Sequence, residues 1–234
     1  MTCRPCEVRD LGWLGWTEAF LIQQKLVEER KAGRIPDQLL FVEHPHVITL
    51  GRNGHLSNIL ASPEMLSRGR VEVRETNRGG DVTYHGPGQV VCYPIFDLRD
   101  WKRDVRAYVQ AIVKAIAGTL AEYGIEAGPD PDAIGVWVDG KKVAAIGVHI
   151  SRWVTSHGFA LNVDTDLSYF RYIVPCGLSK PVTSMKDLGA AAASRTRVVA
   201  QLTRHLAEVF ELDVATWAPL AGDNEFVLNF TEKI

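Results

Sequence analysis

The feature that most constrains the fold is the stretch IGVWVDGKKVAAIGVHI, residues 134–150, in which β-branched residues flank Asp139-Gly140. Asp-Gly is the dipeptide that a two-residue type I′ turn prefers, and such a turn joins two antiparallel strands. A further strand, HGFALNV, is expected directly afterwards at residues 157–163. Alternation places Lys141 and Lys142 on opposite faces of the second strand, so only one of them can face inward.

Three segments predict helices around these strands. Apolar residues recur at helical spacing over residues 16–31, 101–123 and 195–210, and Gly33 and Pro36 end the first segment. The second helix is expected to turn one face inward, made of Val105, Val109, Ile112, Ile116 and Leu120. Other strands are expected at residues 39–44, 47–50, 71–76 and 89–98. Because strand and helix do not alternate regularly, we expect an α+β (mixed α/β) fold with a mixed, mostly antiparallel sheet flanked by helices.

Length and composition indicate the class of protein. With 234 residues, 46% of them hydrophobic, the chain can bury one sizeable core, and we expect a single domain over residues 1–234. A net charge of -2 without long runs of one sign argues against nucleic acid or an anionic membrane as the main partner. The longest apolar stretches are only as long as a strand, so no transmembrane helix is predicted. The N-terminal residues are polar, so no signal peptide is predicted. Four cysteines favour a reducing, cytoplasmic location.

The segment RGGDVTYHGPGQ, residues 78–89, contains four glycines and a proline. Glycine-rich loops often bind phosphate, because a bare backbone can approach an anion closely. This segment lacks the lysine of a Walker loop after Gly88, and it also fails the dinucleotide pattern G-x-G-x-x-G. It is therefore either a plain turn or a binding loop for a group other than phosphate.

Cys176 is a candidate nucleophile, because it lies between Pro175 and Gly177 in a segment expected to be a loop. The proline restricts the backbone and the glycine frees it, which would let N–H groups face an oxyanion. A buried structural cysteine is the alternative. A cysteine nucleophile needs a nearby base or cation. The candidates are Lys142, His85, His149 and His157.

Two other patterns carry less weight. Cys3-Arg4-Pro5-Cys6 has the spacing of a redox or zinc motif, but no second cysteine pair follows it. His44 and His46 flank a proline, which is more typical of a strand edge or a turn than of a metal site. No metal is therefore predicted.

Four blocks together resemble the lipoyl(octanoyl) transferase family of lipoate biosynthesis. They are RGGDVTYHGPGQ (78–89), KVAAIG (142–147) with HGFALN (157–162), IVPCGLS (173–179) and, more weakly, EHPHVITLGR (43–52). The order and spacing match over residues 10 to about 215. The resemblance implies the fold of the biotin and lipoate protein ligase catalytic domain. It also implies an acyltransferase that takes an octanoyl group from octanoyl-acyl carrier protein, holds it as a cysteine thioester, and passes it to a lysine of a lipoyl domain.

By position, the resemblance makes Cys176 the acyl-thioester nucleophile and Lys142 the residue that activates it. It implies an acyl site formed by Arg78, Gly79, Gly80, Asp81, Val82, Thr83, Tyr84, His85, Ala145, Ile146, Gly147, Gly158, Phe159 and Ala160. It further implies a monomer without metal or other cofactor. The expected partners are octanoyl-acyl carrier protein, the lipoyl domains of 2-oxoacid dehydrogenase complexes and the glycine cleavage H protein.

The chemistry of such a reaction fits a pair formed by Cys176 and Lys142. A free thiol with a pKa of about 8.5 is only about 3% thiolate at pH 7, and an acceptor lysine with a pKa of about 10.4 is almost wholly protonated. A lysine in a partly apolar cleft can serve as a general base for such protons. Transfer from a thioester to an amide is downhill, so the reaction needs no ATP.

Further expectations concern the surroundings of the acyl site. Main chain at Gly79, Gly80, Gly86 and Gly88 is expected to pack along the acyl chain, with Tyr84 and His85 in the wall. Asp81 is expected to fix the loop through side-chain to backbone hydrogen bonds. Arg78, with Arg68, Arg70 and Arg74, is expected either to face the phosphopantetheine or the acidic surface of the carrier protein, or to form a solvated basic edge. His149 is expected to be a hydrogen-bonded core histidine.

Three rival functions remain open at this point, and one of them is a thioesterase, if water reaches the acyl-enzyme. An ATP-dependent lipoate or biotin protein ligase would share the fold and a lysine on the equivalent strand, but it would not need Cys176. A non-catalytic acyl-binding module would retain the fold and lose nothing when Cys176 or Lys142 is replaced.

Overall fold

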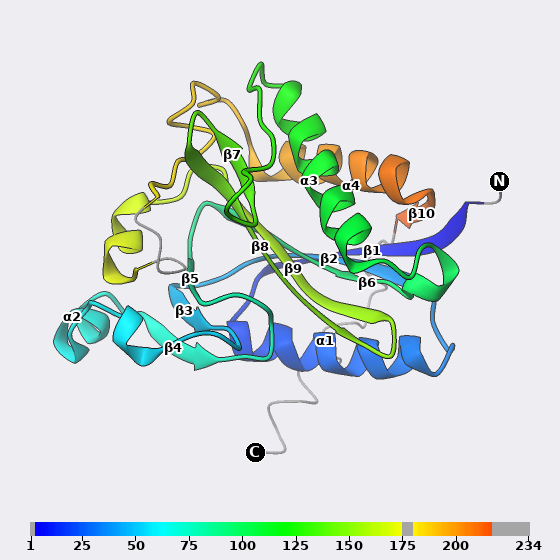
Figure 1. Cartoon of the computed structure of the whole chain (residues 1–234), viewed down its shortest axis with the longest axis horizontal. Coiled ribbons are helices and arrows are strands. Elements are labelled where there is room, and N and C mark those ends of the chain that lie inside the picture. Colours follow the sequence, from blue (N-terminus) through cyan, green and yellow to red (C-terminus); the bar gives the residue numbers. More distant parts are fainter. Residues whose placement is uncertain (1–2, 175–179, 217–234) are drawn as a thin grey trace.

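The structure is a computed structural model, and it describes residues 3–174 and 180–216. Within these residues the chain forms a seven-stranded sheet, a three-stranded sheet and four α-helices. The helices are α1 (Trp16–Lys31), α2 (Pro63–Arg68), α3 (Val105–Ala121) and α4 (Arg195–Phe210). Figure 1 shows α3 and α4 on one face of the large sheet and α1 on the other.

The larger sheet has the strand order β10-β1-β2-β6-β9-β8-β7. Its strands are β1 (Arg4–Trp13), β2 (Asp37–Glu43), β6 (Gln89–Ile95), β7 (Val136–Val138), β8 (Lys141–Ser151), β9 (Val154–Asn162) and β10 (Leu212–Thr216). β1 pairs in parallel with β2 and β10, and the other four neighbouring pairs are antiparallel. The predicted mixed, mostly antiparallel sheet flanked by helices is confirmed.

The turn between β7 and β8 has the geometry predicted from Asp139-Gly140. The backbone φ is 47° at Asp139 and 74° at Gly140, and a type I′ turn requires positive φ at both central residues. The right-handed twist of this turn matches that of the flanking strands, so β7 and β8 continue directly into the large sheet.

The smaller sheet lies beside the large one and has the order β4-β3-β5. Its strands are β3 (Val47–Leu50), β4 (Glu72–Glu75) and β5 (Val82–His85). β5 occupies the middle of the glycine-rich segment, so the expectation of a continuous loop there was wrong. In this stretch Val82 and Tyr84 alternate with Thr83 and His85 as in a strand, and pairing with β3 outweighs the flanking glycines.

Side-chain caps mark the starts of α3 and α4. α1 and α4 begin and end where the sequence predicted. α3 begins four residues later than predicted, because Asp104 caps it by accepting a hydrogen bond from the Ala107 N–H at 3.0 Å. Val105 therefore lies in the first turn, where it is 46% exposed, and its predicted place on the inward face was wrong.

The N-terminal part of the chain holds a strand that the sequence did not predict. β1 contains the C-x-x-C pattern, in which Cys3 is exposed and Cys6 is buried. Burial raises the pKa of the Cys6 thiol, with a further contribution from Asp37. Cys6 therefore packs as a small apolar side chain in the core.

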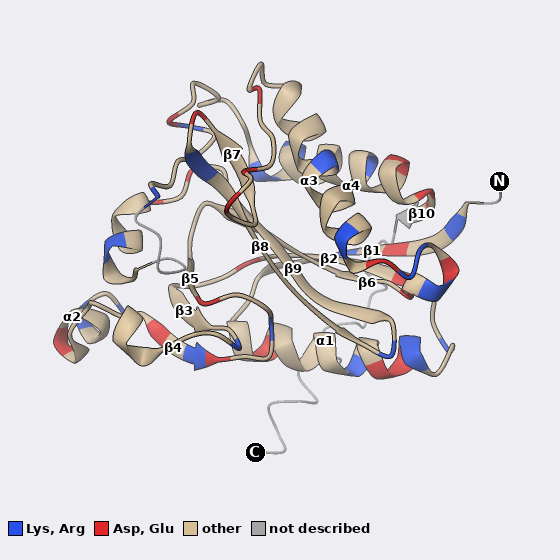
Figure 2. Ribbon diagram, viewed as in Figure 1, with Lys and Arg blue, Asp and Glu red and all other residues tan. Residues whose placement is uncertain are grey.

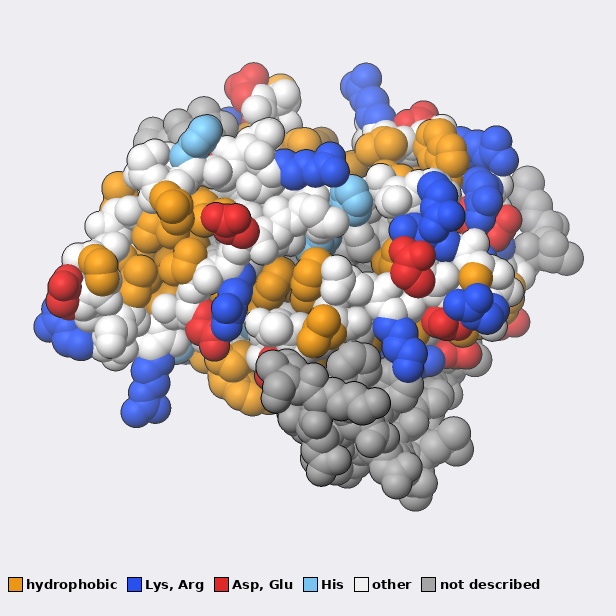
Figure 3. Space-filling view, turned by 90° about the horizontal axis from the view of Figure 1, so that it is seen from below, with side chains coloured by type: hydrophobic (Ala, Val, Ile, Leu, Met, Phe, Trp, Pro, Cys, Tyr) orange, Lys and Arg blue, Asp and Glu red, His pale blue; other side chains and the backbone are white. Residues whose placement is uncertain are grey.

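The central strands are free of charged residues, whereas the surface carries both signs. In Figure 2, β6 and β9 show no Lys, Arg, Asp or Glu, and α1 shows acidic and basic residues interspersed. Figure 3 shows hydrophobic side chains gathered at the end of the molecule that carries α2. Large exposed hydrophobic residues in that region are Leu56, Leu60 and Met65. No helix among the described residues is long and apolar enough to cross a membrane.

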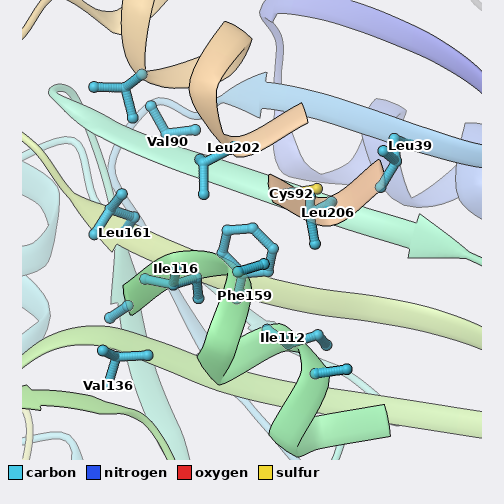
Figure 4. Packing of buried hydrophobic residues seen from close by; sticks show 14 of the residues in the cluster. Leu39, Val90, Cys92, Ile112, Ile116, Val136, Phe159, Leu161, Leu202 and Leu206 are labelled. Atoms are coloured by element: carbon cyan, nitrogen blue, oxygen red, sulfur yellow. The ribbon is translucent and has the colours of Figure 1, made fainter. Parts of the chain in front are cut away.

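The largest core cluster lies between the sheet and the α3–α4 pair. Figure 4 shows Ile112 and Ile116 of α3 and Leu202 and Leu206 of α4 facing side chains of β6 and β9, including Phe159. All four aliphatic side chains have no exposed surface. Side chains of β6, β8 and β9 all take part in this core, and the candidate site is built on those strands.

Candidate functional site

A pocket of about 350 Å³ opens between the strands β6, β8 and β9 and the residues 76–85. Twelve of the fourteen residues predicted for the acyl site line it, all except Asp81 and Tyr84. Further apolar lining comes from Val91, Val148, Phe170 and Val182. The volume is in the range of small-molecule sites, and a wall rich in valine, alanine and phenylalanine suits a hydrocarbon chain.

Lys142 lines the same pocket because of a bulge in β8. Val136 pairs with Ala144 while Trp137 pairs with Lys142, so Val143 is an extra residue in the ladder. Val143 and Ala144 both enter the core, whereas regular alternation would have put Lys142 on the same face as Ala144. The bulge thus directs Lys142 toward the pocket, and Lys141 is exposed.

The backbone and side chain of Lys142 are held from two sides. Its N–H donates to Pro181 O and its C=O accepts from the Thr183 N–H, both at 2.9 Å. Its ammonium nitrogen lies 4.9 Å from the centre of the Trp137 ring. Lys180 Nζ lies 5.1 Å from the same ring and forms an ion pair with Asp130 at 2.7 Å. Two cations therefore share one indole, and one of them, Lys142, lines the pocket.

Cys176 lies outside the described residues, as do its neighbours in 175–179. The described chain on both sides of this segment is at the pocket: Phe170 precedes it and Val182 follows it in the lining. The Val174 N–H donates to Asn58 O at 2.8 Å, and Val182 bridges to Lys142.

The start of the glycine-rich segment is fastened to β8 by main chain. The Gly79 N–H donates to Val148 O at 2.8 Å. A Cβ on Gly147 would lie 3.0 Å from Gly79 O and 3.1 Å from Arg78 Cδ, which is tighter than ordinary van der Waals contact. Glycine at 147 thus allows the segment to lie flat on β8 and form one wall of the pocket.

Arg78 is a buried residue of this wall. Its guanidinium donates to Thr49 O at 2.6 Å, to Thr49 Oγ1 at 2.9 Å and to Gly79 O at 3.1 Å. Arg78 is therefore not part of a solvated basic edge, and whether it faces the carrier arm stays a prediction. These bonds tie the glycine-rich segment to β3, whereas Arg68, Arg70 and Arg74 are exposed.

Other expectations for this segment also need correction. Tyr84 is fully buried outside the pocket lining, stacked on Tyr169 with ring centres 5.2 Å apart. The Asp81 carboxylate accepts from the side chain of Asn58 at 2.6 Å, not from the backbone. Gly86 and Gly88 do not line the pocket. Gly88 has a φ of 78°, and a Cβ there would overlap the Asp164 carbonyl, so its role is in the turn between β5 and β6.

The histidines around the pocket are buried and neutral. Burial lowers the pKa of His85 and of His157 to about 3 and that of His44 to about 4. His157 Nε2 lies 2.7 Å from Asn77 Oδ1, and His157 also lines the pocket. His149 is only half-buried and lies outside the pocket lining, so its assignment as a core histidine was wrong.

Several lining residues were missed by the sequence analysis. They are Trp16, Thr49, Thr76, Val91, Tyr93, Val109, residues 132–134, Val148, His157 as a wall residue, Phe170 and Val182. Val91 and Tyr93 reach the wall because β6 pairs with β9 in the register Val91↔Ala160. The sequence alone does not show this register, because it joins two segments about 70 residues apart. Among the described residues, no cluster of three His, Cys, Asp or Glu side chains is arranged to hold a metal ion.

Comparison with solved structures defines the fold class. Lipoate-protein ligase A bound with ATP superposes with a TM-score of 0.76 at 16% identity, covering 100% of this chain and 95% of that one. A bipartite lipoate protein ligase from Thermoplasma acidophilum gives 0.77 at 16% identity, over 98% and 93% of the two chains. Biotin protein ligase from Aquifex aeolicus gives 0.51 at 10% identity, over 89% and 70%. The chain has the fold of the biotin and lipoate protein ligase catalytic domains, as expected.

Sequence comparison defines the family. The model of the lipoyl protein ligase A/B catalytic domain matches residues 16–207, and the chain belongs to this family. An octanoyltransferase of Solibacter usitatus is 61% identical over 94% of this chain and 99% of its own length. An octanoyltransferase of Acidobacterium capsulatum is 45% identical over 91% and 93%.

Proposed function

We propose that this protein is an octanoyltransferase that moves an octanoyl group from an acyl carrier protein to the lysine of a lipoyl domain, through a thioester on Cys176. The observation that carries the proposal is the apolar pocket into which the β8 bulge directs Lys142. The names of the relatives at 61% and 45% identity support the same activity. The ATP-dependent ligase alternative is not favoured, because these relatives are named as transferases.

In the first half-reaction, the Cys176 sulfur attacks the carbonyl carbon of the donor thioester. A new carbon–sulfur bond forms, the bond to the carrier sulfur breaks, and the thiol proton passes to the departing thiolate. Lys142 acts as the proton carrier between the two sulfurs. The pocket side chains bury the acyl chain: seven methylene or methyl groups at roughly 0.8 kcal/mol each give on the order of 5 kcal/mol.

In the second half-reaction, the acceptor amine attacks the acyl-enzyme carbonyl and the Cys176 sulfur leaves. The acceptor lysine arrives protonated, because its pKa of about 10.4 lies far above neutral pH. It must lose one proton before attack and a second as the amide forms. One of these protons returns to the sulfur and the other goes to solvent through Lys142, so charge and atoms balance.

The chain around Lys142 supports this role. Residues 181–183 pair with Lys142, and Cys176 precedes them by only five residues. Trp137 lies under the ammonium group and limits its positions. The same indole also contacts the Lys180 ammonium, whose charge is paired with Asp130.

The proposal is tested by incubating the protein with octanoyl-carrier thioester without nucleotide and weighing the intact chain. A mass gain of one octanoyl group is expected in the wild type and none in Cys176→Ser. Lys142→Gln should slow loading by at least tenfold, whereas Lys141→Gln, on the exposed side of the same strand, should load normally. Acceptor modification that requires ATP would instead identify a ligase, and full activity in Cys176→Ser would refute the acyl-enzyme.

A further inference from the structure

Three buried polar side chains connect the pocket to the strand segment that holds Lys142. His85 Nδ1 lies 2.8 Å from Gln89 Oε1, and Gln89 Nε2 lies 2.9 Å from Asn162 Oδ1. Asn162 Nδ2 lies 2.9 Å from Thr183 O, and the Thr183 N–H bonds to the carbonyl of Lys142. All three side chains are at most 8% exposed. The chain of hydrogen bonds begins at a wall residue of the pocket and ends at β8.

The direction of every bond in this chain follows from its last member. Thr183 O is a backbone carbonyl and can only accept, so Asn162 must present its amide nitrogen to it. The Asn162 oxygen then faces Gln89, which must donate through its own amide nitrogen. The oxygen of Gln89 consequently faces His85, so the proton of His85 is on Nδ1.

The other ring nitrogen of His85 therefore carries a lone pair. Burial, together with the nearby His44 and Arg78, lowers the pKa of His85 to about 3, so the ring is neutral and has a single N–H. That N–H is used by Gln89. His85 lines the pocket, and within residues 3–174 and 180–216 the structure shows no hydrogen bond to Nε2.

A second pair gives the pocket another acceptor by the same logic. His44 Nδ1 lies 2.8 Å from the backbone carbonyl of Leu14, so His44 must donate there. Its Nε2 then accepts the hydroxyl proton of Tyr93 at 2.8 Å. Burial raises the pKa of Tyr93, so the phenol stays neutral, and its proton points away from the pocket that it lines.

We propose that His85 Nε2 is a fixed hydrogen-bond acceptor that positions an N–H group of the substrate in the pocket, with the Tyr93 oxygen as a second acceptor beside the same wall. This inference rests on the proposed function. A hydrocarbon chain has no donor to offer them, but two N–H groups enter during acyl transfer. One is the amide of the carrier arm and the other is the acceptor amine. His85 is thus a positioning residue for one of these groups; its own proton stays on Nδ1, and it neither takes up nor releases a proton during the reaction.

A binding experiment tests this acceptor without catalysis. Octanamide, which has N–H groups, and N,N-dimethyloctanamide, which has none, are titrated into the wild type by calorimetry. The wild type should bind octanamide about two- to tenfold more tightly, as expected for one neutral hydrogen bond. His85→Asn keeps a donor for Gln89 but removes the acceptor, so it should lose this preference. His85→Gln, which can place an oxygen near the Nε2 position, should retain part of it.

Two further measurements separate positioning from structure. In protein labelled with ¹⁵N-histidine, the His85 nitrogens should give one protonated signal at Nδ1 and one unprotonated signal at Nε2. In single turnovers, His85→Asn should slow loading from the carrier if the carrier amide is the donor, or transfer to the lipoyl domain if the amine is. His149 is a half-buried histidine outside the pocket, so His149→Asn should change neither loading nor transfer.

The outcomes are distinguishable from those for the proposed function. A protonated Nε2 in the NMR spectrum, or an unchanged amide preference in a folded His85→Asn, would overturn the inference even if acyl transfer is normal. Wild-type protein that never acquires an octanoyl group would instead refute the proposed function. In that case the affinities for octanamide and N,N-dimethyloctanamide, together with the NMR signals, would still decide whether His85 is an acceptor.

Discussion

Three glycines allow the packing of the pocket wall to be measured by adding a single methyl group. Gly147 and Gly158 face each other across β8 and β9, and both line the pocket. A Cβ at Gly147 would lie 3.0 Å from Gly79 O, and one at Gly158 would overlap the Cys92 carbonyl of the neighbouring strand. Gly128 has no atom within 4 Å of its Cβ position and is the matched control.

The expected magnitudes follow from these distances. Gly128→Ala should be neutral or stabilise by about 0.4–1 kcal/mol, because it restricts only the unfolded chain. Gly147→Ala requires the glycine-rich segment to shift by a few tenths of an ångström, and overpacking of this kind costs about 1–3 kcal/mol. Gly158→Ala must separate two paired strands, β6 and β9, so its cost should exceed about 3 kcal/mol or prevent folding.

Thermal unfolding and acyl loading together provide the assay. Each kcal/mol shifts the melting temperature by about 2–4 °C in a chain of this size, so the three variants should fall in the order Gly128→Ala, Gly147→Ala, Gly158→Ala. Gly147→Ala should also raise the donor concentration needed for half-maximal loading. The same melting temperature and loading for Gly147→Ala and Gly128→Ala would show that the segment does not lie against β8 as described.

Other consequences can be tested in the same protein. The free energy of unfolding in urea should fall as the pH drops from about 6.5 toward 5, by up to about 1.4 kcal/mol per pH unit for each buried histidine. The reason is that the folded-state pKa is lowered to about 4 at His44 and to about 3 at His157. In this pH range the unfolded chain therefore binds protons that the folded chain does not. A flat profile over that range would contradict the burial of these rings. Trp137→Leu should slow acyl transfer by up to about tenfold and Trp137→Phe by less, because an aromatic face under the Lys142 ammonium contributes about 0.5–2 kcal/mol. Equal rates of acyl transfer in the wild type and Trp137→Leu would exclude a role for the ring. Leu206→Ala should cost about 2–5 kcal/mol in urea unfolding, while Leu56→Ala, at a side chain 66% exposed, should stay within about 0.5 kcal/mol.

Local sequence signals were sufficient where an element is stabilised by its own residues. α4 could be predicted to the residue, since its apolar spacing is regular and Ser194 caps it by accepting from the Arg197 N–H. The β7–β8 turn was predictable because Asp-Gly specifies its backbone. β1 could not be predicted in the same way: RPCEVRDLGW is largely polar, and it is a strand because it pairs in parallel with both β2 and β10. The pairing with β10 joins residues about 200 positions apart.

The same distinction applies to the candidate site. The lining at 145–147 and 158–160 was predicted from the family resemblance, and in the structure these two contiguous blocks face each other in neighbouring strands. The resemblance assigned the whole segment 78–85 to the acyl site, but β5 is a strand whose residues alternate between two faces, and Tyr84 lies outside the pocket lining. Val182 and Phe170 enter the wall through contacts made by the chain on each side of residues 175–179. No pattern within either segment indicates those contacts.

The bulge in β8 reconciles two demands on the stretch KKVAAIG. The core between the sheet and α3 needs apolar residues, and Val143 and Ala144 fill it with no exposed surface. Regular alternation would add Lys142 to that face, where an ammonium without a partner would cost several kcal/mol. One extra residue in the ladder lets two consecutive small side chains enter the core and leaves the lysine on the pocket side. The placement of the proposed proton carrier is therefore a consequence of how the sheet packs, and a lysine at 141 could not take its place.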